Sequence, residues 1–262
     1  MTHTAFMNGV QLLPLCHFPL VQPGDDLVRC IDEALTTNQL CLQEGDILVL
    51  AQKIVSKAEN RYRALDTVTP SPAAQALAVD THKDPRLVEL VLQESARVLR
   101  HRKGSIVVEH KLGFVHAHAG IDQSNLPGNA NSDHALLLPE NPDASAAAVR
   151  TALQAHHGVT ALGVVINDSF GRAWRLGTVG TAIGVAGFDP LLDLRGQPDL
   201  FGRTLEITQV GLGDEIAAAA SLLMGQAGEG VPAVLVRGLR WSAGETGSVR
   251  SLLRPPQEDM FR

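Results

Sequence analysis

Residues 161–168 read Ala-Leu-Gly-Val-Val-Ile-Asn-Asp, a continuous apolar run that ends on two polar residues. Such a run predicts a strand over 161–166. Residues 178–185 form a second apolar run, interrupted by glycines, and are also predicted to be a strand. Further towards the N-terminus, Gly45-Asp46 opens the sequence ILVLAQKIVS, which is rich in β-branched residues and predicts a buried strand over 47–56.

Helices and hairpins surround these runs. Capping residues and apolar spacing predict helices over 26–38, 73–79, 85–99, 141–155 and 214–224. Further strands are predicted over 105–110, 113–118, 134–138, 204–210 and 233–236. Because hairpins occur beside crossovers, we predict an α+β fold with mixed sheets and helices. We treat residues 1–262 as one unit, with a subdomain boundary predicted near 104–113.

Composition excludes several classes of protein. The 262 residues are 45% hydrophobic and 19% charged, which is enough for a sizeable core and too apolar for a disordered chain. The net charge of -6 and the 4% aromatic content argue against nucleic-acid binding. No apolar stretch approaches the roughly 20 residues of a spanning helix, and no secretory signal is visible. Because the chain has only three cysteines, we expect a cytoplasmic protein. Because no apolar stretch is long enough to span a membrane, we expect no membrane partner.

An acidic residue follows an apolar strand at two places. Asp122 comes after the predicted strand through His118, and Asp168 ends the run at 161–166. Carboxylates at strand ends, followed by polar loops, commonly hold Mg²⁺ or Mn²⁺ over phosphates. An Asp beside Ser or Gly is also a common cap of a turn or helix, so both interpretations stay open.

Basic and glycine-rich segments could bind an anion. Arg172 and Arg175 lie in the loop after Asp168, and Lys53 and Lys57 flank the end of the early strand. Guanidinium and ammonium groups suit phosphates, although such clusters are often merely solvated. The glycines of 177–187 and 224–230 would let backbone amides approach a nucleotide, or would allow tight packing. No P-loop, complete dinucleotide fingerprint or hydrolase elbow is present.

Two histidine pairs have alternative interpretations. His116 and His118 alternate along a predicted strand, so they share one face and could bind a transition metal, but no third ligand is evident. His156 and His157 end a predicted helix, where a positive charge interacts favourably with the helix dipole.

Six ordered segments carry a resemblance to a known family: LPL at 13–15, GDILVLAQKIVSKAENR at 45–61, GFVHAHAGIDQSN at 113–125, LLPENPDASA at 137–146, VVINDSFGRAWRLGTVGTAIGVAG at 164–187, and DEIAAAASLLMGQAGEGVPAVLVRG at 214–238. Together they resemble the coenzyme F420:L-glutamate ligases, or gamma-glutamyl ligases. The resemblance implies a GTP-dependent ligase that adds L-glutamate to F420-0, a deazaflavin, and extends a gamma-linked tail. It also implies two intertwined subdomains in a ligase-specific fold, a homodimer, Mg²⁺ or Mn²⁺, and stimulation by K⁺.

The resemblance also implies roles for individual residues. The metal ligands would be Asp122, Asp168, Ser169 and Gln226. The catalytic residues would be Asp122, Asp168, Lys57 and Arg172. The contacts to GTP would come from Leu13, Pro14, Leu15, Cys16, Gln52, Lys53, Lys57, Asn125, Met224, Gly225, Gln226, Ala227, Gly228, Glu229, Gly230 and Val231. Two departures stand out: Ala173 replaces the usual proline of the loop after Asp168, and His116 and His118 replace residues that are more often small or amide-like.

The implied chemistry agrees with the residues. Amide formation from a free carboxylate needs a good leaving group, which an acyl phosphate made from the GTP γ-phosphoryl group would supply. Phosphoryl transfer depends on charge neutralisation, for which the two Asp and the nearby cations are suited. The same residues would also suit a metal-dependent nucleotide phosphohydrolase, and a non-catalytic deazaflavin-binding module is a further alternative.

Overall fold

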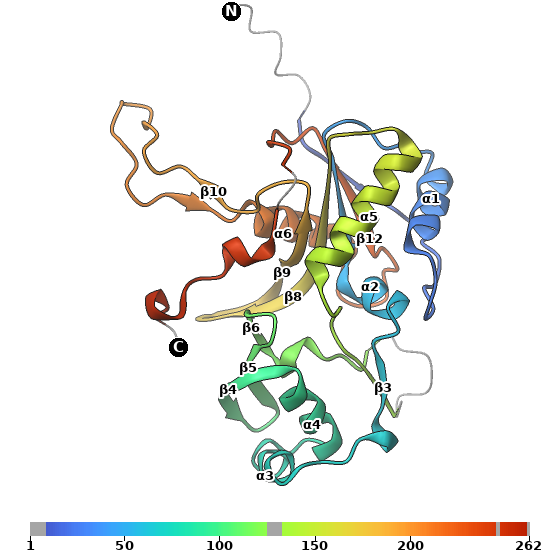
Figure 1. Ribbon diagram of the computed structural model, residues 1–262, viewed down its shortest axis with the longest axis vertical. Helices are drawn as coiled ribbons and strands as arrows, with labels where there is room; N and C mark the ends of the chain where they lie inside the picture. Colours follow the sequence, from blue (N-terminus) through green and yellow to red (C-terminus); the bar gives the residue numbers. More distant parts are fainter. Residues whose placement is uncertain (1–8, 125–132, 245–246, 261–262) are drawn as a thin grey trace, which may run out of the picture.

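A five-stranded sheet forms the centre of the molecule (Figure 1). The computed structural model describes residues 9–124, 133–244 and 247–260. Strands β2 and β8 lie side by side in parallel, whereas the other neighbouring pairs of this sheet are antiparallel. The strands, in their order across the sheet, are β1 (Gln11–Pro14), β12 (Ala233–Arg237), β2 (Asp46–Ala51), β8 (Leu162–Arg172) and β9 (Arg175–Ala186).

Both faces of this sheet are covered by helices, which explains the continuous apolar runs of β2 and β8. Alternate residues of β2 point into different cores: Leu48 and Leu50 contribute to one, and Ile47 and Val49 to the other. Helices α1 (Leu27–Thr37) and α5 (Pro142–His157) cover the first face, and α6 (Leu212–Met224) covers the second. The predicted α+β fold is therefore confirmed.

The glycines of β9 serve close packing of helices on the sheet. A Cβ atom at Gly180 would collide with the backbone of Ala217 in α6, and one at Gly184 would collide with Pro142 in α5. Of the two interpretations of the glycine-rich segment 177–187, the geometry of these two positions fits tight packing.

A second, smaller body packs below the central sheet in Figure 1 and is called the small lobe, residues 72–117. Helices α3 (Pro72–Thr81) and α4 (Pro85–Gln93) pack on a three-stranded sheet in the order β4 (Ser95–Arg102), β5 (Ser105–His110) and β6 (Val115–Ala117). These elements share a hydrophobic core that includes Val88 and Ile106. The predicted subdomain boundary near 104–113 falls on β5, and a division of the chain into separate units stays a prediction.

The remaining elements connect these bodies. Helix α2 (Gln52–Ala58) follows β2 directly, and β3 (Tyr62–Ala64) pairs with β7 (His134–Leu136). Strands β10 (Leu192–Asp193) and β11 (Gln209–Val210) form the base of a projecting segment, called the arm, residues 192–210 (Figure 1). Short 3-10 turns cover Leu65–Thr67, His118–Gly120, Val249–Leu252 and Pro256–Glu258. Within the described ranges, no helix has the length and apolar character needed to cross a membrane.

Four local predictions were wrong, and the short strands β1, β3 and β10 were not predicted. Residues 52–56 belong to α2 and not to a strand, and the helix predicted over 85–99 ends at Gln93 and gives way to β4. The strand predicted over 113–118 is limited to 115–117, and that over 204–210 to 209–210. Pairing with β5 decides the outcome for β4, whose own sequence has helix-forming character. Strand β1 was not predicted because it is short and lies at the sheet edge.

An aromatic series joins the small lobe to β8. The His110 ring stacks on Phe114 with ring centroids 5.1 Å apart, and Phe114 lies edge-on to Phe170 of β8 at 5.3 Å. His116 packs edge-on against Phe170 at 4.1 Å. These contacts fix the position of the small lobe relative to the end of β8.

We predict that His110 makes the protein sensitive to acid. Burial lowers the pKa of His110 from 6.5 to about 4, and its Nδ1 atom accepts the Leu112 amide, so protonation there would lose this hydrogen bond. The unfolded chain therefore binds more protons below pH 6.5, and stability falls as the pH falls from about 6.5 to about 4. We expect His110 alone to lower the free energy of unfolding by about 2 kcal/mol when the pH falls from about 7 to about 5.

Urea unfolding at both pH values would measure this effect. Between these two pH values, the free energy of unfolding should fall less in His110→Asn than in the wild type, and the difference should be about 2 kcal/mol. His101→Gln, at an exposed histidine of the same lobe, is the matched control and should keep the wild-type slope. An equal slope in wild type and His110→Asn would contradict the assignment.

Candidate active site

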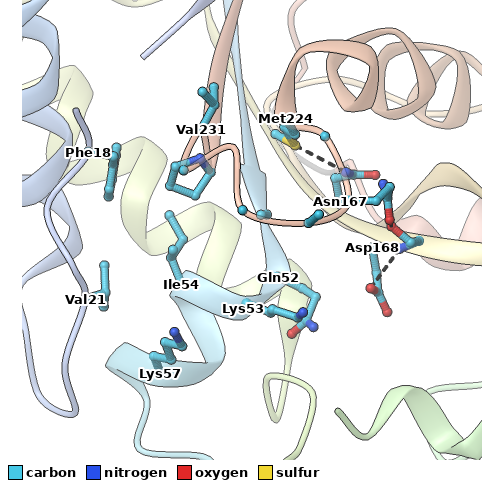
Figure 2. Close-up of a pocket in the computed structure, with 18 of the residues that line it drawn as sticks. Phe18, Val21, Gln52, Lys53, Ile54, Lys57, Asn167, Asp168, Met224 and Val231 are labelled. Atoms are coloured by element: carbon cyan, nitrogen blue, oxygen red, sulfur yellow. Dashed lines mark hydrogen bonds between the residues drawn. The ribbon is translucent and has the colours of Figure 1, made fainter. Parts of the chain in front are cut away.

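A cavity of about 410 Å³ opens where β2 ends, beside the middle of β8 (Figure 2). Because the two strands are parallel and Ala51 lies opposite Asn167, the start of α2 after β2 reaches the same place as Asp168 and Ser169 within β8. Twelve of the residues predicted for the site line this cavity: Gln52, Lys53, Lys57, Asp168, Ser169, Met224, Gly225, Gln226, Ala227, Gly228, Gly230 and Val231. They come from three segments that are far apart in the sequence.

Three oxygen-bearing side chains meet on one wall of the cavity. The Ser169 hydroxyl donates a hydrogen bond to Gln226 Oε1 over 2.7 Å, and the Ser169 amide donates to Asp168 Oδ1 over 2.7 Å. A carboxylate, a hydroxyl and an amide oxygen are the hard donors that Mg²⁺ and Mn²⁺ prefer. This donor set fits the predicted ion.

Asp168 also contacts the small lobe. Its Oδ2 atom lies 3.1 Å from His116 Nε2, and both side chains are largely buried. The His118 side chain has a different partner, since its Nε2 atom accepts the Ile106 amide over 3.3 Å. Burial lowers the pKa of His118. The two imidazoles face different partners because His118 begins a 3-10 turn with positive φ, so the alternation assumed for a strand ends there.

An ion pair with Lys53, which lines the cavity, connects Asp122 to the site. Its Oδ2 atom lies 2.7 Å from Lys53 Nζ, which also donates to Ser124 Oγ, and its Oδ1 atom accepts the Ser124 amide over 2.6 Å. Burial by itself would raise the pKa of Asp122, but the hydrogen bonds from Lys53 and Ser124 outweigh it and lower the pKa. A backbone bridge to Leu136 holds this segment in place.

The second lysine gives the cavity further positive charge. Lys57 follows Lys53 by one helical turn of α2, and both line the cavity. Burial lowers the pKa of Lys57, and the charge of Lys53 lowers it further, while Asp122 acts in the opposite direction. Gln52, at the start of α2, is buried and accepts a hydrogen bond from Ser56.

The loop over 224–231 forms another wall. Gly225 and Gly230 have positive φ, and the Glu229 carboxylate accepts the Ala227 amide over 2.8 Å. A Cβ atom at Gly225 would collide with the Glu229 carboxylate, so this loop shape needs glycine there. Hydrogen bonds from its own backbone amide and then from the Ala227 amide lower the pKa of the Glu229 carboxyl group.

Other predicted residues lie elsewhere. Leu13 and Pro14 belong to β1 and precede Leu15 and Cys16, while the lining of the cavity begins at Phe18. Arg172 lies at the exposed end of β8, where its guanidinium donates to the Leu176 carbonyl. Asn125 lies outside the described residues. The assigned roles of these residues stay predictions.

The sequence analysis missed the apolar wall of the cavity, which lies across from Asp168. Phe18, Val21 and Ile54 line the cavity beside Pro232, and Figure 2 shows Phe18 and Val21 on the segment that faces α2. The proline-rich apolar segment after Cys16 was the available signal, but an apolar residue in a loop does not reveal which surface it covers.

Comparison with known proteins agrees with this geometry. The model of the family described as F420-0:Gamma-glutamyl ligase matches residues 16–238. A coenzyme F420:L-glutamate ligase of Methanothermobacter thermautotrophicus is 47% identical over 255 residues, which cover 97% of this chain and 99% of that protein. Ligases of the same name from Methanopyrus kandleri and Archaeoglobus fulgidus are 44% and 41% identical, and they cover 98% and 97% of this chain and 100% and 96% of their own lengths.

The matched segment includes strands β2 and β8, helix α2, the Asp122 segment and the loop over 224–231. Resemblance in sequence and the grouping of these residues in one cavity therefore point to the same conclusion. The chain belongs to the F420-0:gamma-glutamyl ligase family.

Proposed function

We propose that this protein is a GTP-dependent ligase that joins L-glutamate to the lactyl carboxylate of the deazaflavin F420-0 and then extends a gamma-linked glutamate tail. Relatives named coenzyme F420:L-glutamate ligase, similar over nearly the whole chain, support the overall reaction. The observation that carries the proposal is the single cavity in which Asp168, Ser169 and Gln226 lie opposite Lys53 and Lys57. Oxygen donors beside lysines suit a metal-bound nucleoside triphosphate.

The proposed reaction has two steps. A carboxylate oxygen of F420-0 attacks the γ-phosphorus of GTP, the bond to GDP breaks, and an acyl phosphate forms. The glutamate amine then attacks the acyl carbon, inorganic phosphate leaves, and the amine gives up a proton. In the first step, the ammonium groups of Lys53 and Lys57 would stabilise the negative charge that spreads over the phosphate oxygens.

Asp168, Ser169, Gln226 and Asp122 are the proposed ligands of Mg²⁺ or Mn²⁺. Such an ion supplies positive charge to the triphosphate. Asp122 is held near the cavity by Lys53, so a change of partner between Lys53 and a bound phosphate would free its carboxylate for this role. Stimulation by K⁺ stays a prediction.

The loop over 224–231 is proposed to bind the GTP phosphates through its backbone. Gly225 and Gly230 supply the positive φ of the loop, and a phosphate would take the place of the Glu229 carboxylate on the amides that it now accepts. The carboxylate of Glu229 is engaged by the Ala227 amide of the same loop.

We also propose that two copies of the chain form a homodimer. Several large apolar side chains are almost fully exposed on the arm and on the end of the β8–β9 hairpin: Trp174, Leu176, Leu200, Phe201 and Ile207. The arm projects away from the central sheet (Figure 1). Apolar surface of this kind is typical of protein interfaces, and a second copy is the occupant that the family resemblance predicts.

A mass measurement of the reaction product tests the ligase proposal. With GTP, Mn²⁺, F420-0 and L-glutamate, we expect a deazaflavin product heavier by one glutamyl residue, together with GDP and phosphate. Phosphate release that needs neither glutamate nor F420-0 would favour a phosphohydrolase. Deazaflavin binding without GTP turnover would favour a non-catalytic module.

Substitution of the two carboxylates extends this test. Asp168→Asn and Asp122→Asn should each lower kcat by about 100-fold or more, because each removes charge that neutralises the triphosphate. Circular dichroism should be unchanged, since neither side chain belongs to the cores. Asp66→Asn removes an exposed carboxylate outside the cavity and should keep full activity. Near-normal turnover of Asp168→Asn would refute its role.

We predict that Gly225→Ala weakens GTP binding. The added methyl group would displace Glu229 and change the shape of the loop, which should raise the KM for GTP by about 10-fold or more. Gly244→Ala is the matched control, because its Cβ atom meets nothing within 4 Å and its φ is not positive. Steady-state kinetics with varied GTP would measure both, and an unchanged KM in Gly225→Ala would contradict the proposed phosphate contact.

The proposed homodimer is tested by light scattering coupled to size-exclusion chromatography. The wild type should have twice the mass of the chain. Phe201→Asp combined with Ile207→Asp should give a monomer, because two charges would have to be buried in the interface. Val79→Asp, at a similarly exposed apolar position of the small lobe, is the control and should remain dimeric. A monomeric wild type would overturn the proposal.

A further inference from the structure

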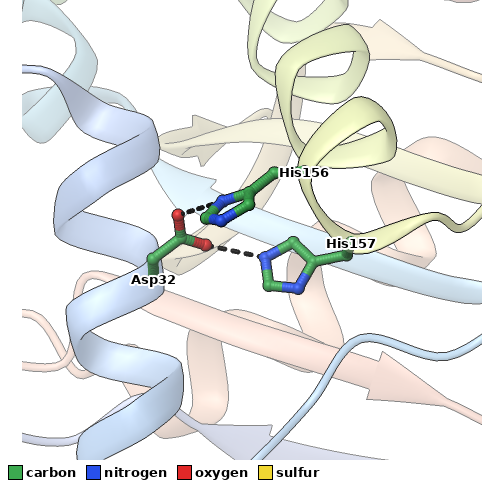
Figure 3. Close-up of side chains that lie close together, drawn as sticks. All are labelled: Asp32, His156 and His157. Atoms are coloured by element: carbon green, nitrogen blue, oxygen red, sulfur yellow. Dashed lines mark hydrogen bonds and ion pairs between the residues drawn. The ribbon is translucent and has the colours of Figure 1, made fainter.

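The C-terminal end of α5 brings two histidines to one carboxylate of α1 (Figure 3). His156 Nδ1 lies 2.7 Å from Asp32 Oδ2, and His157 Nε2 lies 2.7 Å from Asp32 Oδ1. The candidate ligand atoms of the three residues all lie within 4.8 Å of one another. The sequence analysis predicted only that the two histidines lie at a helix end. Local sequence patterns do not indicate that α1 packs beside that end.

This cluster is remote from the candidate active site. Helix α5 ends at His157, and β8 begins at Leu162 and reaches the cavity at Asp168. Six residues of extended strand span about 20 Å. The cluster and the cavity therefore lie at opposite ends of the central strands, and the proposed ligase reaction does not use the cluster.

Two imidazole nitrogens and one carboxylate oxygen form a ligand set suited to Zn²⁺ and similar transition metals, whereas Mg²⁺ prefers oxygen. Ligand atoms around a tetrahedral Zn²⁺ ion lie roughly 3.3 Å apart. The two distances of 2.7 Å run to different oxygens of Asp32, and one ligand atom from each residue lies within 4.8 Å of the others. Side-chain rotations that change these distances by about 1 Å would give the spacing of a Zn²⁺ site.

Exposure suits an ion with three protein ligands and a water molecule. The side chains of Asp32 and His157 are 21% and 22% exposed, while that of His156 is 62% exposed. Asp32 and His157 are thus packed against the protein, whereas the more exposed His156 side chain can change its rotamer. An ion bound here would be open to solvent on one side. Without an ion, each imidazole donates its proton to the carboxylate. With an ion, each ring would carry its proton on its other nitrogen and offer a lone pair instead.

We propose that Asp32, His156 and His157 form a structural transition-metal site, of Zn²⁺ type, that ties α1 to the end of α5. Both helices cover the same face of the central sheet, and their apolar residues share one core. An ion bound to both would add a link between them that exists only in the folded protein, and would stabilise it by mass action.

Calorimetric titration with Zn²⁺, in an excess of Mg²⁺ to occupy oxygen-rich sites, tests the proposal. We expect one Zn²⁺ ion per chain, and His157→Gln or Asp32→Asn should weaken its binding by roughly 10-fold or more. His101→Gln is the matched control, because His101 also faces an aspartate, Asp80, but belongs to no group of three candidate ligands among the described residues. This control and Asp168→Asn should both bind Zn²⁺ as the wild type does.

Two further readouts distinguish a metal site from a set of hydrogen bonds. Bound Co²⁺ should give visible absorption in the wild type, and this absorption should be lost in the variant with Asp32→Asn, His156→Gln and His157→Gln together. At a free Zn²⁺ concentration about 100 times the Kd, the melting temperature of the wild type alone should rise by roughly 5 °C or more. Zn²⁺ binding equal in the wild type and the triple variant, or abolished by Asp168→Asn, would overturn the proposal.

Discussion

The parallel pairing of β2 with β8 is the constraint on which the candidate active site depends. Their register places Leu50 opposite Ile166 and Ala51 opposite Asn167, so α2, which follows β2, begins beside Asp168 and Ser169 of β8. In an antiparallel pair, Lys53 and Asp168 would lie at opposite ends. Since β2 is also paired with β12, the same register brings the loop that precedes β12 over the cavity.

A buried ion pair holds the other end of β2. Asp46 is almost fully buried, and its two oxygens lie 2.9 Å and 2.7 Å from Nε and a terminal nitrogen of Arg237 in β12. A bidentate pair of this kind has a defined geometry, and removal of one partner would leave an unpaired buried charge. The pair therefore favours one alignment of β12 on β2, which the position of the 224–231 loop requires.

The small lobe contributes to the same site from outside the central sheet. Phe114 and Phe170 bring the lobe against β8, and this contact places His116 beside Asp168. The segment after the lobe carries Asp122 to Lys53. The site thus combines segments whose packing is stabilised by apolar and aromatic contacts, and its charged groups are positioned by that packing. His116, where the sequence analysis predicts a departure from the family, contacts a proposed metal ligand.

The sequence by itself determined the α+β class, the buried strands that begin near residues 46 and 162, most helices, and, through the family resemblance, twelve of the residues that line the cavity. These features depend on neighbours along the chain: apolar runs, caps such as Asp26 and Asn141, and motifs of adjacent residues. Only the tertiary structure decided that 95–102 is a strand, that Lys53 pairs with Asp122, and that Asp32 lies between His156 and His157. Each of these depends on which distant segment packs alongside, and that is set by sheet register and core packing, which local sequence patterns do not encode.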